Sequence, residues 1–169
     1  MTVNYIQTDG YVGTPPINVA GDTTQRMPLG QYVEATDASS TAYGEADFIY
    51  VKFTGTCAAG DLVVVDRQAK TAVQSGTTAA RGYVGLAMGA QTTGCFGYVM
   101  VRGVHDAANV LTGSTLTTGI VQTYISALTA GRITSAVTAN MIIDGITLKV
   151  SGASNVGTVE LVWPYCSGR

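Results

Sequence analysis

Residues 48–53 have the sequence Phe48-Ile49-Tyr50-Val51-Lys52-Phe53. In an extended strand, the even-numbered side chains of this run face one side and the odd-numbered ones face the other. Five of the six residues are apolar or aromatic, so we expect both faces to be covered by other parts of the protein. Branched and aromatic side chains also fit a pleated sheet, and the run therefore predicts a central β-strand.

Similar runs continue toward the C-terminus and are separated by glycine-containing turns. Leu62–Val65 follows a Gly60-Asp61 turn, residues 70–74 alternate like an exposed edge strand, and 82–88 and 94–103 form a further pair. The chain has 21 glycines spread along its length. Glycines at this frequency interrupt helices, and the runs between them are rich in β-branched and aromatic residues, so an all-helical fold is not expected.

Gly85 and Gly97 lie inside two of these predicted strands. Glycine weakens a strand unless curvature requires it, so both positions predict bulges or tight bends of the kind that close a sheet into a barrel. We therefore expect an all-β fold. Its form would be a small barrel or sandwich of short, glycine-punctuated antiparallel strands, with an extended N-terminal arm and at most one or two short helices.

The region after Val104 has less regular patterns. Residues 120–141 are compatible with a helix or with strands, because apolar residues at helical spacing occur among many β-branched ones. Asp144-Gly145 lies between apolar runs and predicts a two-residue hairpin turn. Residues 156–163 predict a last strand, which ends at Pro164.

The first 44 residues differ from the rest of the chain. Pro15 and Pro16 fix their own φ and disfavour helix in the residues before them, and large apolar side chains are not clustered here. We predict an extended N-terminal arm over residues 1–44, lying on a surface, and a single β-rich domain over residues 45–169.

The composition favours assembly with other proteins. Charged residues make up 12% of the chain, and hydrophobic residues 46%. A surface with few ions loses little hydration free energy when subunits meet, although an ordinary neutral domain can have the same composition. Residues 1–47 hold one basic and six acidic side chains, whereas residues 48–169 hold eight basic and five acidic ones, so the two parts attract each other.

Several partners and compartments are not expected. The basic residues form no cluster, which argues against nucleic acid as a partner. No apolar run is long enough to span a bilayer, and none resembles a secretion signal. We expect a protein made in the cytoplasm, with no membrane partner.

The sequence offers little catalytic chemistry. His105 is the only histidine, and its neighbour Asp106 would point to the opposite face of a strand, so the two do not form an oriented pair. Cys57, Cys95 and Cys166 lack the spacing of a metal site or a disulfide framework and are expected to be buried thiols. We predict no catalytic, cofactor or metal site. A small hydrolase using His105 is a distant alternative.

Aromatic residues could line a carbohydrate-binding platform, but in strands they more often pack in the core or between subunits. The candidates are Tyr43, Phe48, Tyr50, Tyr83, Phe96, Tyr98, Tyr124, Trp163 and Tyr165.

The segment from Glu45 to Val104 resembles the small-barrel decoration (cement) proteins of tailed-phage heads. The similarity lies in the aromatic strand at 48–52, the Gly60-Asp61 turn into Leu62–Asp66, and the strands at 82–88 and 97–103. It covers about sixty residues and consists of strands and glycines, without a chemical signature. The region after Val104 is longer than in the smallest decoration proteins.

The resemblance implies a virion structural protein that binds the outer capsid surface, commonly as a homotrimer, and stabilises contacts between major capsid protein subunits. A phage head-fibre or tail-associated module that binds a receptor or carbohydrate is the main alternative. We expect the arm to carry the protein interface through its apolar and aromatic residues. These are Tyr5, Ile6, Tyr11, Val12, Pro15, Pro16, Ile17, Met27 and Tyr32.

Overall fold

The computed structural model describes residues 5–8, 15–38, 43–77, 81–111, 122–135, 141–151 and 155–167. These residues form strands and loops, and none of them is helical. The strands are β1 (Tyr5–Gln7), β2 (Tyr32–Asp37), β3 (Glu45–Phe53), β4 (Leu62–Asp66), β5 (Thr71–Gln74), β6 (Gly82–Ala87), β7 (Phe96–Asn109), β8 (Thr123–Ile125), β9 (Ile133–Thr134), β10 (Ile142–Ser151) and β11 (Val156–Cys166). The predicted all-β fold is confirmed.

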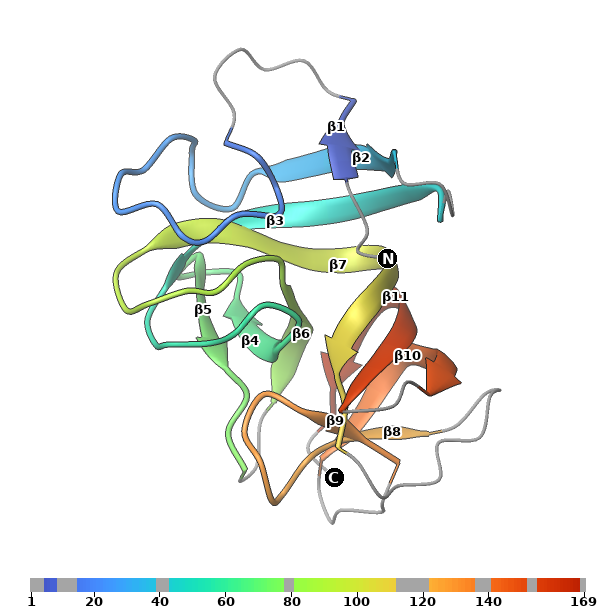
Figure 1. Cartoon of the computed structure of the whole chain (residues 1–169). Helices are drawn as coiled ribbons and strands as arrows, with labels where there is room; N and C mark the ends of the chain where they lie inside the picture. Colours follow the sequence, from blue (N-terminus) through green and yellow to red (C-terminus); the bar gives the residue numbers. More distant parts are fainter. Residues whose placement is uncertain are drawn as a thin grey trace.

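Five strands form a small ring in the middle of the molecule. The order β3-β5-β4-β6-β7 returns to its start because β3 also pairs with β7 (Figure 1). Two of the strand pairings in the ring are short: β3 with β5 and β6 with β7 share two residue pairs each. The β3–β5 pairing is parallel, whereas the other pairings between named strands are antiparallel. β1 and β2 extend the sheet on one side of the ring, and β8 to β11 extend it on the other (Figure 1).

The alternation in β3 has the predicted two-sided character. Ile49, Val51 and Phe53 belong to one buried cluster, to which the other ring strands contribute mostly valine and alanine. Phe48 and Tyr50 belong to a second, larger cluster that includes residues of β10 and β11. All five side chains are at most 2% exposed. β3 is therefore covered on both faces, as its sequence predicts.

Gly85 lies where the ring closes. A Cβ atom at this position would lie 2.5 Å from the carbonyl oxygen of Met100 and 2.5 Å from Cγ1 of Val99. Both contacts belong to β7, with which β6 pairs at the adjacent residues Leu86 and Ala87. Only glycine allows this approach of the two strands. The sequence predicts a bulge or bend at Gly85, whereas the strand pairings of β6 show no register shift there.

The described parts of residues 1–44 are built into the body. Tyr5, Ile17 and Met27 are 2–6% exposed and belong to the same cluster as Phe48. The Tyr5 ring packs edge-on against Phe48 at 5.1 Å, and its hydroxyl donates to the carbonyl of Val104 at 2.5 Å. Residues 15–31 run without a strand, as the prolines suggest. The described parts of residues 1–44 thus pack against the β-rich domain.

The predicted hairpin turn at Asp144-Gly145 is wrong. β10 continues through both residues, and Gly145, with a φ of 82°, faces an irregular stretch of β11. A Cβ atom there would lie 2.5 Å from the carbonyl oxygen of Val162. The glycine therefore permits close contact between strands, and β11 passes Pro164 and continues to Cys166.

The ambiguous region 120–141 contains two short strands, β8 and β9, within its described residues. β8 pairs with β10 and with β9. Residues 120, 121 and 136–140 lie outside the described part of the chain.

Candidate docking surface

An exposed group of aromatic side chains surrounds one arginine. We call this group, which consists of Tyr32, Arg67, Tyr83, Trp163 and Tyr165, the aromatic–arginine cluster. Its members come from β2, the β4–β5 turn, β6 and β11. The turn that carries Arg67 is held by Asp66, whose carboxylate accepts hydrogen bonds from the backbone amides of residues 68 and 69.

The Arg67 guanidinium organises the cluster. Its central carbon lies 4.0 Å from the centroid of the Tyr83 ring and 5.7 Å from the centroids of Tyr32 and Trp163. It also donates a hydrogen bond to the Tyr32 hydroxyl. The Tyr32 and Trp163 rings are 5.4 Å apart, and those of Tyr83 and Tyr165 are 5.5 Å apart. Cation–π and aromatic contacts thus fix five side chains in one arrangement before any partner binds.

The four aromatic residues of the cluster remain 39–45% exposed. Val162, next to Trp163, adds a further apolar side chain that is 59% exposed. Tryptophan, tyrosine and arginine are the residues that most often dominate the binding free energy of protein interfaces. A pre-arranged, exposed cluster of them indicates a contact surface.

Trp163 is held outward by an unusual backbone. Its φ is 48°, in the left-handed region that large side chains seldom occupy. The residue lies in the irregular stretch between Leu161, which pairs with Ile146, and Tyr165, which pairs with Asp144. Conformations of this kind cost about 1–3 kcal/mol and are concentrated at functional positions.

A groove of about 300 Å³ adjoins the cluster and is lined by Tyr32, Val33, Glu34, Asp47 and Trp163. The Asp47 carboxylate binds the Arg102 guanidinium through two hydrogen bonds, of 2.6 and 2.9 Å. Glu34 lies 3.8 Å from Nη2 of the same arginine. Aromatic rings and carboxylates therefore line the same hollow.

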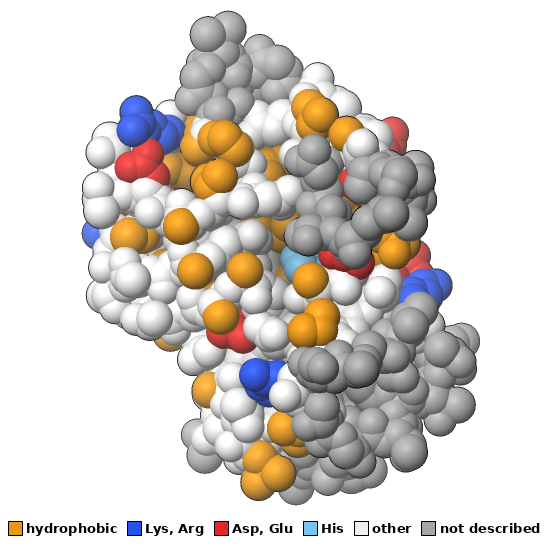
Figure 2. Space-filling view, viewed as in Figure 1, with side chains coloured by type: hydrophobic (Ala, Val, Ile, Leu, Met, Phe, Trp, Pro, Cys, Tyr) orange, Lys and Arg blue, Asp and Glu red, His pale blue; other side chains and the backbone are white. Residues whose placement is uncertain are grey.

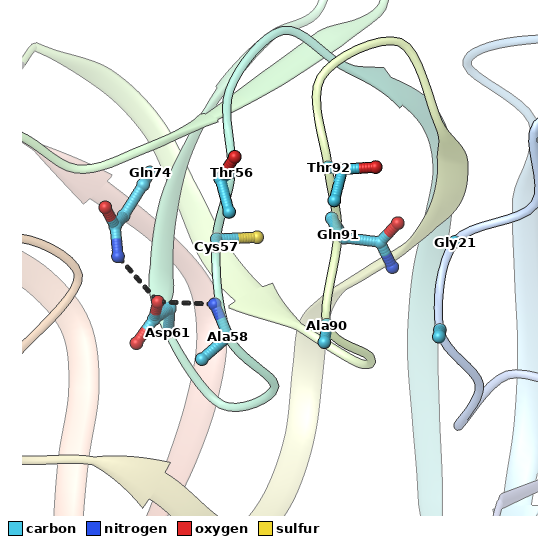
Figure 3. A pocket seen from close by; sticks show the side chains of 10 residues that line it. Gly21, Thr56, Cys57, Ala58, Asp61, Gln74, Ala90, Gln91 and Thr92 are labelled. Carbon is cyan, nitrogen blue, oxygen red and sulfur yellow. Dashed lines mark hydrogen bonds between the residues drawn. The ribbon is translucent and has the colours of Figure 1, made fainter.

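A second, larger hollow of about 650 Å³ lies beside the β3–β4 and β6–β7 loops (Figure 3). The Asp61 carboxylate in its wall accepts hydrogen bonds from the Ala58 amide and the side chains of Gln74 and Asn109. Burial and, less strongly, Asp61 raise the pKa of Cys57 to about 11. The hydrogen bonds of Asp61 hold the loops together. The raised pKa keeps the Cys57 thiol protonated near neutral pH, so Cys57 is a poor nucleophile.

His105 lies buried on β7, with 5% of its surface exposed. Its Nδ1 accepts a hydrogen bond from the Ala107 amide. Burial lowers the pKa of His105 to about 4, and the charge of Asp106 opposes this shift only in part. A buried, weakly basic imidazole is a poor general base near neutral pH.

The predicted interface residues are scattered in the structure. Tyr5, Ile17 and Met27 are in the core, Ile6 and Pro16 are exposed, and Pro15 is half-buried. Tyr11 and Val12 lie outside the described residues. Tyr32 is the one member of the predicted set that belongs to the cluster. Trp163, Tyr83 and Tyr165 were only among the general aromatic candidates, and no sequence pattern pointed to Arg67.

Comparisons with protein-family models, curated proteins and solved structures find no match to this chain. Within the described ranges, no helix has the length and apolar character needed to cross a bilayer. The same ranges contain no group of three histidine, cysteine or acidic side chains placed to hold a metal ion.

Proposed function

We propose that this protein is a capsid decoration protein that docks on the outer surface of a tailed-phage head through the aromatic–arginine cluster. Bound there, it would bridge neighbouring major capsid protein subunits and stabilise the shell. The observation that carries this proposal is the set of four aromatic side chains, each 39–45% exposed, of which three lie around a single guanidinium and the fourth, Tyr165, packs on Tyr83.

The low charge of the chain supports docking by this route. Lys, Arg, Asp and Glu side chains are few and scattered on the face shown in Figure 2. Charged residues make up 12% of the chain. Docking therefore removes water from few ions outside the cluster and its groove, and the aromatic rings supply most of the favourable free energy. A homotrimer, as the resemblance implies, would present three such clusters, and their linked binding would raise the avidity for a shell.

The segments that carry the resemblance to decoration proteins coincide with ring strands. The runs at 48–52, 62–66, 82–88 and 97–103 fall in β3, β4, β6 and β7 or directly beside them. The burial of His105 and the protonated state of Cys57 also favour a structural role over catalysis. Fold and site chemistry thus both support a protein that acts by binding.

Binding to isolated heads tests the proposal. Expanded heads lacking this protein would be mixed with the purified wild-type chain or with Trp163→Ala, and the bound fraction would be measured by co-sedimentation. We expect Trp163→Ala to bind at least about 30-fold more weakly, which is the effect of removing an interface hot spot.

Leu128→Ala is the matched control, because Leu128 is 82% exposed and lies outside the cluster. It should bind like the wild type. Circular dichroism would verify that both variants are folded. Equal binding of folded Trp163→Ala and wild type would refute the proposed docking surface, and no binding of the wild type would refute the proposed function.

A further inference from the structure

We infer that the groove between Tyr32 and Trp163 on one side and Glu34 and Asp47 on the other accepts a lysine or arginine side chain of the docking partner. This inference rests on the proposed function and specifies the chemistry of the partner at one position. The groove is lined by these four residues and Val33 and encloses about 300 Å³, enough for one long side chain.

The two rings of the groove also line a second hollow. Tyr32 and Trp163 form part of a small pocket that contains Arg67, Tyr83 and Pro164. Arg67 is not among the residues that line the groove. Tyr32 and Trp163 therefore line two hollows, one that includes the protein's own Arg67 and one that does not. A cation that lies over a ring face in the second hollow would be attracted by the ring electrons.

The charges of the groove select a cation. Glu34, Asp47 and Glu45 all act electrostatically on Arg102, and Asp47 and Glu34 form ion pairs with it. Asp47 engages that guanidinium through both oxygens. Glu34 is 44% exposed and lies farther away, at 3.8 Å. Three carboxylates against Arg102 and Arg67 leave one net negative charge around the groove. Of the two carboxylates that line the groove, Glu34 is the more exposed, at 44% against 19% for Asp47.

Donor and acceptor chemistry favours the same ligand class. Guanidinium and ammonium groups only donate hydrogen bonds, and carboxylates only accept them. A saccharide, the other ligand that aromatic and acidic side chains commonly bind, presents hydroxyls that must also find donors. Both guanidinium groups near the groove already donate hydrogen bonds, Arg102 to Asp47 and Arg67 to the Tyr32 hydroxyl, whereas two carboxylates line the groove. The groove therefore matches a cationic side chain better than a sugar ring.

Trp163 is the only tryptophan of the chain, and its fluorescence therefore reports directly on the groove. The wild-type chain would be titrated with a capped tri-arginine peptide, with a capped tri-citrulline peptide as the neutral isostere, and with methyl glycosides. We expect a saturable change in emission with tri-arginine alone. A similar change with tri-citrulline, or a saturable change with a glycoside, would overturn the inference.

Glu34→Gln removes the exposed carboxylate without changing its size. Glu160→Gln is the matched control, because Glu160 is 39% exposed, pairs with Lys149 on β10 and is not among the residues that line the groove. We expect Glu34→Gln to raise the tri-arginine concentration at half-saturation by about fivefold or more and Glu160→Gln to leave it unchanged. An unchanged midpoint for Glu34→Gln would contradict a cation site.

Head binding separates this inference from the proposed function. If Glu34→Gln binds heads more weakly than Glu160→Gln, the groove contributes to docking as inferred. If Glu34→Gln binds heads like the wild type while Trp163→Ala does not, the cluster docks without a cation in the groove. That result would overturn the inference and leave the proposed function intact.

Discussion

The guanidinium carbon of Arg67 lies 4.0 Å from the centroid of the Tyr83 ring. The same guanidinium donates a hydrogen bond to the Tyr32 hydroxyl, so one cation connects β6 with β2, two strands that are not neighbours in the sheet. The contact holds the Tyr32 and Tyr83 rings in place while both remain exposed. Arg67 therefore acts as the organiser of the candidate docking surface.

Replacing Arg67 tests this role. We expect Arg67→Ala to weaken binding to heads by at least about 30-fold. The rings would lose the guanidinium that holds them together, and the docked interface would lose a cation that the partner covers. Unfolding free energy should fall by only about 1 kcal/mol, since the cluster is exposed. Arg26→Ala is the control, as Arg26 is 53% exposed and pairs only with nearby Asp22 among the described ion pairs. Equal binding of both variants would argue against an organising role.

Substitution of Tyr5 tests whether the N-terminal segment contributes to the stability of the domain. Its ring packs on Phe48, and its hydroxyl bonds to the Val104 carbonyl, so Tyr5→Ala should lower the free energy of unfolding by about 3 kcal/mol. The neighbouring Ile6 is 57% exposed, and Ile6→Ala should change it by less than about 0.5 kcal/mol. Urea unfolding measures both values. A free arm would instead give two variants of wild-type stability.

Substitution of Gly85 tests the close contact between β6 and β7 in the ring. In Gly85→Ala the new methyl group would meet the Met100 carbonyl at 2.5 Å, and we expect a loss of at least about 2 kcal/mol in unfolding free energy. In Gly55→Ala the corresponding contact is a γ-methyl group of half-exposed Val73 at 3.1 Å, which can move. The second variant should stay close to wild type. Equal stabilities would show that β6 and β7 are less tightly packed than described.

His105 makes stability depend on pH in a defined direction. Burial lowers its pKa from 6.5 to about 4 in the folded protein, so between these values the unfolded chain binds a proton that the folded one does not. Stability is fully present above pH 6.5 and is lost as the pH falls toward 4. Between pH 7 and pH 5 the loss should be about 2 kcal/mol.

The control for this prediction is His105→Gln, which cannot titrate in that range. Its unfolding free energy, measured by urea unfolding, should change by less than that of the wild type between pH 7 and pH 5. Parallel pH profiles for the two proteins would mean that other groups cause the dependence.

Much of the fold could be predicted from local patterns. The alternation in 48–53 identified a strand covered on both faces. Gly85 marked a position where glycine is required, although the reason is the close approach of β6 and β7 and not a bulge. The hairpin expected at Asp144-Gly145 failed because a glycine with positive φ also serves a close contact between strands, here with the Val162 carbonyl. Sequence alone does not distinguish these two uses.

The N-terminal segment and the candidate site depend on tertiary contacts. Tyr5, Ile17 and Met27 reach the core singly and far apart in sequence, so they leave no periodic signal. The cluster draws Tyr32, Arg67, Tyr83 and Trp163 from four separate elements. Each of these residues has a common sequence environment, and only the pairing of strands brings them around one guanidinium.

The most direct test of the docking surface is electron cryo-microscopy of heads decorated with this protein, at a resolution that shows side chains. We predict that Tyr32, Arg67 and Trp163 lie against major capsid protein subunits and lose their exposure to solvent. A decorated head in which the aromatic–arginine cluster faces solvent while another face of the protein contacts the shell would contradict the account.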